Sequence, residues 1–265
     1  MVRFSRKHMG IPYVLFLVVF VVLPLFVILY YALTGGEGQF TLENFSTFFT
    51  NRKALRTLLY SLLIAVATTG SCLLIAYPTA YILARGAFRR GSVLVLLLVL
   101  PMWINFTLRI TALKEILDFL EGNLAMHPFL NTVICMVYDY LPFMILPLYT
   151  TISKLDQSLP EAAADLGASR LHIFRRVIIP LSMPGIVSGV TMVFLPAMTN
   201  YVVLDMIYNS NYIMGSLIGS YFNVYDWHNG SMISIILLLF MFGITWLTDR
   251  FADKQGVESR GGGIW

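Results

Sequence analysis

Long apolar stretches separated by shorter polar segments dominate this chain. Six of them reach or approach the ~20 apolar residues that a helix needs to cross a hydrocarbon core of ~30 Å. They are Ile11–Leu33, Leu58–Leu83, Ser92–Ile110, Leu130–Ile152, Pro184–Ile207 and Met232–Thr248. This pattern predicts an all-α membrane protein in which about six transmembrane helices occupy residues 11–250. The fifth stretch is the most interrupted, because it contains Pro196, Asn200 and Asp205.

The polar segments between and around these stretches predict smaller features. Residues 35–57 are too many for a tight turn, and Thr41–Phe49 predicts a short interfacial helix. The first apolar stretch follows Arg and Lys, as in a signal peptide, but it is longer than the apolar core of a typical signal peptide and lacks a small-residue cleavage site. We therefore interpret it as a retained span. Residues 251–265 are charged and then Gly-rich, which predicts a disordered tail.

The composition agrees with a lipid-embedded chain. Hydrophobic residues make up 58% and charged residues 12% of the 265 positions, and that charged share is about half of the ~25% found in soluble domains. So few charges cannot cover a particle of 29.9 kDa in water.

The distribution of basic residues predicts the orientation of the spans. If residues 1–10 are cytoplasmic, the inside loops carry most of the 18 Lys and Arg residues. The outside loops then hold Arg52, Lys53, Arg56, Arg109 and Lys114. By the positive-inside rule, both termini are cytoplasmic. The net charge of +4 thus reflects membrane topology and does not indicate nucleic-acid binding.

Several kinds of chemistry have no supporting motif. No Lys follows a Gly, so the phosphate-binding G-K-[ST] sequence is missing, and no G-x-S-x-G or H-E-x-x-H motif occurs. The four histidines are scattered, and Cys72 and Cys135 lie inside apolar runs, where they are interpreted as small buried side chains. We expect no enzymatic activity, no metal site and no cofactor bound by this chain.

One polar segment, residues 154–180, predicts a short helical hairpin between the fourth and fifth spans. Ser158 and Glu161 have capping-box spacing, and Pro160 falls in the first helical turn. Gly167 then suits a left-handed helix end, and Ser169 can cap a second helix whose Leu171, Phe174 and Val177 share a face. Periodicity alone is equally consistent with an ordinary amphipathic connector.

The same segment contains a recognisable pattern. Glu161, Ala162, Ala163, Gly167 and Pro180, with Asp165 between them, resemble the cytoplasmic EAA loop of ABC importer permeases. Val177 and Ile179 replace the Ile and Leu usual in that motif. Segments 101–110, 140–169, 177–186 and 194–202 extend the resemblance to the permeases of spermidine/putrescine importers, whereas the sequence DWHNG at 226–230 departs from them.

The resemblance implies a type I ABC importer (MetI-like) permease fold in the bacterial cytoplasmic membrane. It further implies a second permease subunit, two copies of an ABC ATPase that holds ATP and Mg²⁺, and an extracytoplasmic polyamine-binding protein. Residues 154–180 would dock on the ATPase. In this view the chain forms half of a polyamine pathway.

Polar and aromatic groups inside the spans are candidates for that pathway, because intramembrane polar groups usually face a bundle interior or a cavity. A carboxylate and aromatic faces suit ammonium groups. The candidates are Trp103, Asn105, Tyr138, Asp139, Tyr140, Asn200 and Asp205. Asp139 is equally consistent with a structural contact to a neighbouring helix, and the aromatic residues with interfacial anchoring.

Two alternative functions remain open from the sequence. An importer of the same class could carry another small solute, such as an organophosphonate, ferric iron or an opine. A self-contained channel or secondary transporter has the same hydropathy.

Overall fold

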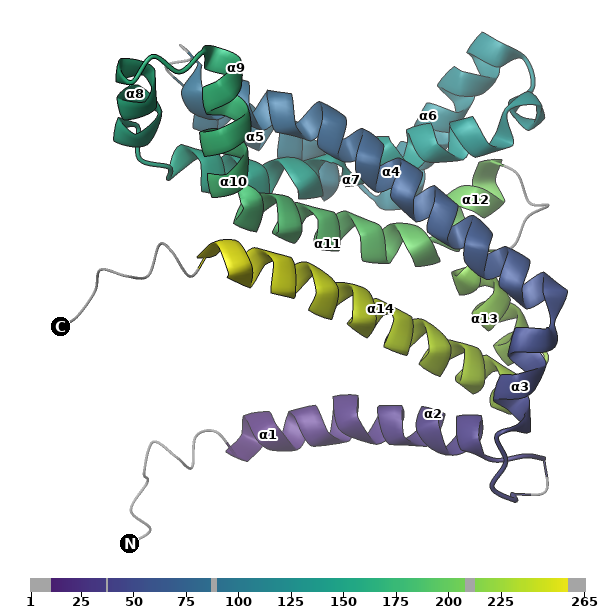
Figure 1. The fold of residues 1–265 in the computed structure, drawn as a ribbon. Coiled ribbons are helices and arrows are strands. Elements are labelled where there is room, and N and C mark those ends of the chain that lie inside the picture. Colours follow the sequence, from purple (N-terminus) through teal and green to yellow (C-terminus); the bar gives the residue numbers. More distant parts are fainter. Residues whose placement is uncertain (1–10, 37, 87–89, 208–212, 257–265) are drawn as a thin grey trace, which may run out of the picture.

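The computed structural model describes residues 11–36, 38–86, 90–207 and 213–256, and these are almost entirely helical (Figure 1). Within these ranges the extended backbone forms a single isolated bridge, between Thr34 and Phe40. The predicted cytoplasmic N-terminus, residues 1–10, and residues 257–265 of the predicted tail lie outside the described residues.

The helices follow one another in a long series. In the first half of the chain they are α1 (Ile11–Leu17), η2 (Val18–Val22), α2 (Leu23–Leu33), α3 (Glu43–Thr50), α4 (Arg52–Arg85), α5 (Gly91–Val99), η3 (Leu100–Trp103), α6 (Phe106–Glu121) and η4 (Leu124–Met126). In the second half they are α7 (Pro128–Ser153), α8 (Ser158–Asp165), α9 (Arg170–Ile173), η5 (Phe174–Ile178), α10 (Ile179–Leu181), α11 (Met183–Thr199), α12 (Tyr201–Ile207), α13 (Met214–Asn223) and α14 (Trp227–Gly256).

The prediction of an all-α membrane protein with about six spans is confirmed. Four helices are long and apolar enough to cross a membrane: Ile11–Leu33, Arg52–Arg85, Pro128–Ser153 and Trp227–Trp246. Two further pairs of helices, 91–103 with 106–121 and 170–181 with 183–199, qualify together but are bent by 96° and 64°. The predicted helix at Thr41–Phe49 is present as α3.

The third predicted span, Ser92–Ile110, is wrong as a single straight helix. Its helix ends in the 3₁₀ turn η3, Ile104 is extended, and α6 begins at Phe106 in a new direction. The physical causes are Pro101, which has no N–H to donate, and Asn105, whose side chain caps the new helix.

The second half of the chain also differs from the prediction in places. The fifth predicted span, Pro184–Ile207, is interrupted at Asn200, where α11 ends and α12 follows. The segment between the fifth and sixth predicted stretches contains α13. The last helix continues through Gly256, six residues into the segment predicted to be disordered.

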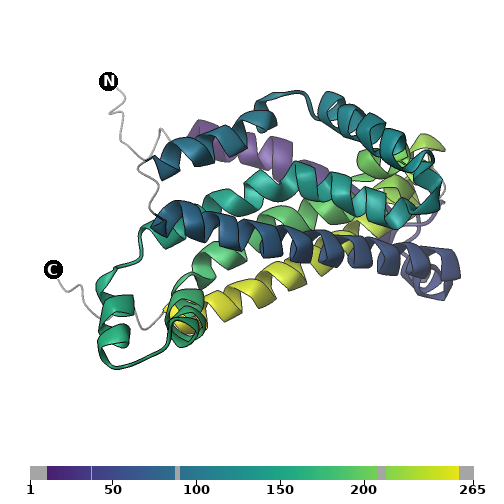
Figure 2. The same ribbon diagram turned by 90° about the horizontal axis from the view of Figure 1, so that it is seen from above.

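The core of the bundle lies between α4, α7 and α11, which run side by side (Figure 2). Two glycines of α11 allow it to approach α7 closely. A Cβ at Gly185 would lie 2.7 Å from Thr151 Oγ1, and one at Gly189 would lie 2.6 Å from Met144 Sδ. This small-xxx-small spacing is a common helix contact in membranes. Cys72 and Cys135 are fully buried in the same core, as predicted.

Two π-helical segments accompany proline residues. Segment η2 ends two residues before Pro24, and η5 ends two residues before Pro180. A proline ring clashes with the carbonyl four residues earlier and leaves it without a donor. The wider π turn absorbs this clash, so both helices pass through their prolines without a break.

The first span lies at the edge of the bundle, beside α14 (Figure 1). Its large apolar side chains from Ile11 to Tyr30 are mostly exposed, and Ala32 is the buried residue of α2. An apolar helix surface of this size requires apolar surroundings, which a lipid bilayer supplies.

Candidate functional site

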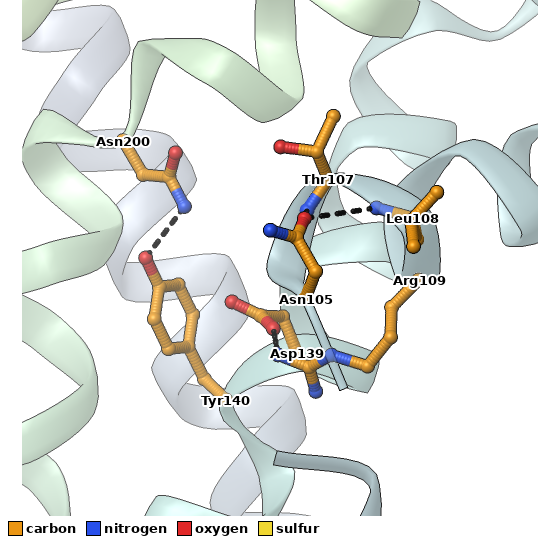
Figure 3. A network of polar contacts seen from close by, with 7 residues as sticks. All are labelled: Asn105, Thr107, Leu108, Arg109, Asp139, Tyr140 and Asn200. Atoms are coloured by element: carbon orange, nitrogen blue, oxygen red, sulfur yellow. Dashed lines mark hydrogen bonds and ion pairs between the residues drawn. The ribbon is translucent and has the colours of Figure 1, made fainter. Parts of the chain in front are cut away.

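Two parts of the structure collect the residues predicted to be functional. The first is the hairpin of residues 154–180, called the EAA hairpin below, which projects from one end of the bundle as α8 and α9 (Figure 1). The second is a group of polar side chains around the start of α6, the middle of α7 and the end of α11 (Figure 3).

The start of the EAA hairpin differs from the predicted capping box. Ser158 is the first residue of α8 rather than its cap, and no side chain caps the helix from Gln157. Asp156 Oδ1 instead accepts a hydrogen bond of 3.0 Å from the Ser158 N–H. This bond lowers the pKa of Asp156 below its ordinary value. The carboxylate two residues upstream thus replaces the serine hydroxyl as the turn-forming group.

The predicted turn of the hairpin is confirmed. Gly167 has a φ of +82°, and its N–H donates to Ala164 O at 2.9 Å, while the Ala168 N–H donates to Ala163 O at 3.1 Å. Ser169 caps the second arm, because its Oγ accepts a hydrogen bond from the His172 N–H at 3.4 Å. The second arm continues through η5 and α10, where Pro180 is half-buried.

The outer surface of the hairpin is unusually apolar for a short polar connector. Leu159, Leu166 and Leu171 are 48%, 89% and 62% exposed. Phe174 and Val177, predicted to share a face with Leu171, are instead half-buried. The predicted signature residues Glu161, Ala162, Asp165 and Gly167 are exposed, and Ala163 is half-buried. Exposed leucines beside small side chains form a surface suited to a protein partner.

The base of the hairpin is fastened to the end of α4. The ring of Phe174 makes edge contacts with Tyr77 and Tyr81, with 5.7 Å between centroids in each case. Arg85 Nη2 donates to Leu155 O at 2.5 Å. These contacts join both arms of the hairpin to α4.

The polar group near the helix breaks is centred on Asp139 of α7 (Figure 3). This residue is 4% exposed, and its Oδ1 lies 2.5 Å from Nη2 of Arg109 on α6. Arg109, counted above with the outside charges, has its side chain buried between α6 and α7 and not in a loop. The signal that could have found the pair is an Arg and an Asp in neighbouring apolar stretches.

Three other predicted residues lie around this pair (Figure 3). Asn200, at the end of α11, donates from Nδ2 to the hydroxyl of Tyr140 at 2.7 Å. Asn105 caps α6 by accepting hydrogen bonds from the N–H groups of Thr107 and Leu108 at 2.9 and 3.4 Å. The structure thus brings Asn105, Asp139, Tyr140 and Asn200 together from three separate spans.

The remaining predicted pathway residues are exposed on this single chain. Trp103 is 84% exposed beside the break in the third span, Tyr138 is 41% exposed on α7, and Asp205 is exposed on α12. None of the three takes part in the hydrogen bonds drawn in Figure 3. Among the described residues no group of three or more His, Cys, Asp or Glu side chains is arranged to hold a metal ion.

Comparison with known proteins defines the class. Residues 3–255 match the family described as binding-protein-dependent transport system inner membrane component, and the chain belongs to that family. It is therefore a multi-pass permease subunit of an ABC importer in the bacterial inner membrane, and not an enzyme. This class is favoured over a self-contained channel or secondary transporter.

More specific similarities exist within that class. The chain is 38% identical over 264 residues to the spermidine/putrescine transport system permease protein PotB of Escherichia coli K12, covering 90% of this chain and 96% of that one. It is 36% identical to PotB of Haemophilus influenzae, over 85% and 86% of the two chains.

Solved structures show the same fold at low identity. A chain of a bacterial ABC transporter that imports alginate superposes with a TM-score of 0.71 at 14% identity, over 94% of each chain. A chain of the MetNI methionine ABC transporter gives 0.58 at 16% identity, over 76% of this chain and 95% of that one. The predicted type I importer fold is confirmed by these likenesses.

Proposed function

We propose that this chain is the permease subunit of a polyamine importer, which forms half of the pathway for spermidine and putrescine. The observation that carries the proposal is the 38% identity to PotB over nearly the whole length of both proteins. The buried carboxylate of Asp139 beside Tyr140 supports it, because a carboxylate and an aromatic ring both attract ammonium groups. Organophosphonate, ferric iron and opine are the less favoured substrates.

The complete importer in this proposal has four kinds of subunit. A PotC-like permease pairs with this chain, two copies of a PotA-like ATPase bind ATP and Mg²⁺, and a PotD-like protein delivers polyamine from outside. Membrane lipid surrounds the spans, and nucleic acid has no role. Both termini and the EAA hairpin face the cytoplasm, where the exposed Leu159, Leu166 and Leu171 give the ATPase an apolar surface to bind.

Coupling requires that each nucleotide state of the ATPase bind the inward-facing and the outward-facing permease with different affinity. If the affinities were equal, nucleotide could not shift the equilibrium between these two conformations. The hairpin is the element through which this difference acts. Its attachment to α4 by Phe174 and Arg85 carries the movement into the bundle.

Reconstitution tests the proposal directly. The four kinds of subunit are placed in proteoliposomes, and uptake of radiolabelled spermidine is measured with ATP inside, with and without competing putrescine, organophosphonate, ferric iron or opine. We expect ATP-dependent uptake that only polyamines inhibit. Uptake driven by an ion gradient without ATP, or inhibition by another solute but not by putrescine, would refute the assignment.

A charge reversal on the hairpin separates coupling from folding. Glu161 is exposed, so Glu161→Lys leaves insertion intact but is expected to abolish ATP-driven uptake. The matched control is Asp118→Lys, an exposed acid on α6, which is far from the hairpin. Equal loss of uptake in both variants would contradict the role of the hairpin.

A further inference from the structure

Arg109 and Asp139 form an unusual ion pair. It is the one pair between a permanently charged base and a carboxylate in the described part of the chain, and its side chains are only 7% and 6% exposed. Two opposite charges this deeply buried are each desolvated, so both depend on their mutual contact. The pair also joins α6, the outer half of the broken third span, to α7.

The guanidinium of Arg109 is poorly satisfied in this position. One nitrogen, Nη2, contacts Asp139 Oδ1, whereas Nε and Nη1 are buried without a hydrogen-bond partner. A guanidinium normally uses its planar set of five donors, often two at once on one carboxylate. Arg109 contacts Asp139 through Nη2 alone, so another cation that makes one such contact can replace it at the carboxylate.

The helix end beside the pair disfavours Arg109 as the cation at Asp139. Arg109 lies four residues after the cap Asn105, near the positive N-terminal end of α6, which repels a cation. At Asn200 the C-terminal end of α11 meets the start of α12, so the two helix ends there largely offset each other (Figure 3). A mobile cation that reaches Asp139 away from the start of α6 would therefore meet better electrostatic surroundings than Arg109 has.

From this geometry we propose that Arg109 is an internal counter-ion of Asp139 that a substrate ammonium group replaces during transport. In the empty pathway Arg109 neutralises the buried carboxylate. When polyamine arrives, one ammonium group takes the place of Nη2 at Asp139 Oδ1. Return of Arg109 then displaces the ammonium group and releases the substrate. The exchange breaks one ionic contact and forms one, with no change in covalent bonding.

The inference rests on the proposed polyamine substrate and explains a problem that this substrate creates. An uncompensated buried carboxylate would hold a polycation too tightly for rapid turnover. A competing cation attached to the protein weakens binding and speeds release. Arg109 thereby sets both the affinity and the turnover of the pathway.

The test uses the whole importer in proteoliposomes, for transport, and the detergent-solubilised complex without the binding protein, for equilibrium binding of radiolabelled spermidine. Arg109→Gln leaves Asp139 without its competitor, so we expect at least tenfold tighter spermidine binding, a lower KM and at least tenfold slower turnover. Asp139→Asn should raise the KM at least tenfold. The double variant, Arg109→Gln with Asp139→Asn, should assemble normally yet bind spermidine as weakly as Asp139→Asn alone.

Two further variants keep the result interpretable. Arg109→Lys retains a buried cation, so it keeps the test valid if Arg109→Gln fails to assemble. It should turn over faster than Arg109→Gln and restore weak binding. Lys114→Gln removes the same charge from the same helix without touching Asp139 and should leave the KM unchanged.

Different outcomes refute different statements. If the double variant regains both assembly and the original KM, the pair is only structural and the exchange is refuted. The same holds if Arg109→Gln and Arg109→Lys bind spermidine as the unmodified complex does. If the unmodified complex transports no polyamine, the proposed function fails first and the exchange fails with it.

Discussion

Replacement of Gly167 at the turn of the EAA hairpin probes how a backbone conformation controls coupling. Its φ of +82° lies in the left-handed region, and a Cβ at this position would meet no atom within 4 Å. Gly167→Ala therefore introduces backbone strain but no clash within the chain. For an L-residue that strain is about 1–2 kcal/mol, which corresponds to a roughly 5–30-fold shift in population away from this turn.

A graded series separates backbone strain from side-chain bulk. Asparagine tolerates the left-handed region, alanine does so less well, and β-branched valine is the least compatible. We expect ATP-driven spermidine uptake to fall in the order Gly167→Asn, Gly167→Ala, Gly167→Val, with the amount of membrane-inserted protein unchanged. Uptake per hydrolysed ATP in proteoliposomes is the quantity to measure.

Gly122 supplies the matched control. It ends α6 with a φ of +73° and also has nothing within 4 Å of a built Cβ, so Gly122→Ala carries the same strain at a site away from the hairpin. Normal uptake is expected in that variant. If Gly122→Ala reduces uptake as much as Gly167→Ala, the effect reflects general stability. If Gly167→Asn lowers uptake as much as Gly167→Val, the size of the side chain at the partner surface controls uptake, and the explanation by backbone strain is refuted.

Three other predictions concern packing and capping. Gly189→Leu should destabilise the α7–α11 contact by about 1–3 kcal/mol through overpacking, lowering the unfolding temperature in detergent, whereas Gly70→Leu, whose Cβ faces open space, should not. Phe174→Ala removes two aromatic contacts worth about 0.5–1.5 kcal/mol each and should lower uptake per hydrolysed ATP while ATPase activity persists; unchanged coupling would count against α4 as the receiving helix. Asp156→Ala should speed hydrogen exchange of the backbone N–H groups at the start of α8 at neutral pH. Because the pKa of Asp156 is lowered in the fold, its stabilisation is present above the ordinary Asp pKa of about 3.9 and is lost as the pH falls through the lower folded value. Equal exchange in this variant and the unmodified chain between pH 5 and 7 would exclude the cap.

Features of this chain that local forces decide could be predicted from its sequence, whereas features that tertiary packing decides could not. The span that ends at Leu33 was predicted because an uninterrupted apolar run in lipid has no alternative to a helix. The turn at Gly167 was predicted because left-handed backbone selects glycine locally. The break near Asn105 was missed because an average over Ser92–Ile110 conceals a single cap residue. The Gly185 contact was also missed, although its spacing from the next glycine was visible.

The candidate functional residues also divide into those placed by local sequence and those placed by tertiary packing. The residues of the EAA hairpin form one contiguous pattern, so their positions could be predicted together. The group around Asp139 assembles from three spans, and its pairing with Arg109 depends on how α6 turns after its break. Arg109 lies at the end of the apolar stretch Ser92–Ile110, and hydropathy gives no information on where its side chain points after that turn. A buried contact across a bend is decided by packing and not by local sequence.

Helix α4 has a length that matters for transmission across the membrane. Its 34 residues extend over about 51 Å at 1.5 Å per residue, against a hydrocarbon thickness of about 30 Å. It would have to tilt by more than 50° to fit inside, beyond the usual range of about 0–40°, so at least one end stands outside the hydrocarbon. One end holds the EAA hairpin, and towards the other end Ser61 Oγ accepts a hydrogen bond of 2.8 Å from Met214 of α13. Because the helix is continuous, a rotation of about 10° around its midpoint moves each end by about 4 Å in opposite directions. A displacement at one side of the membrane can thus be transmitted to the other side through one continuous helix.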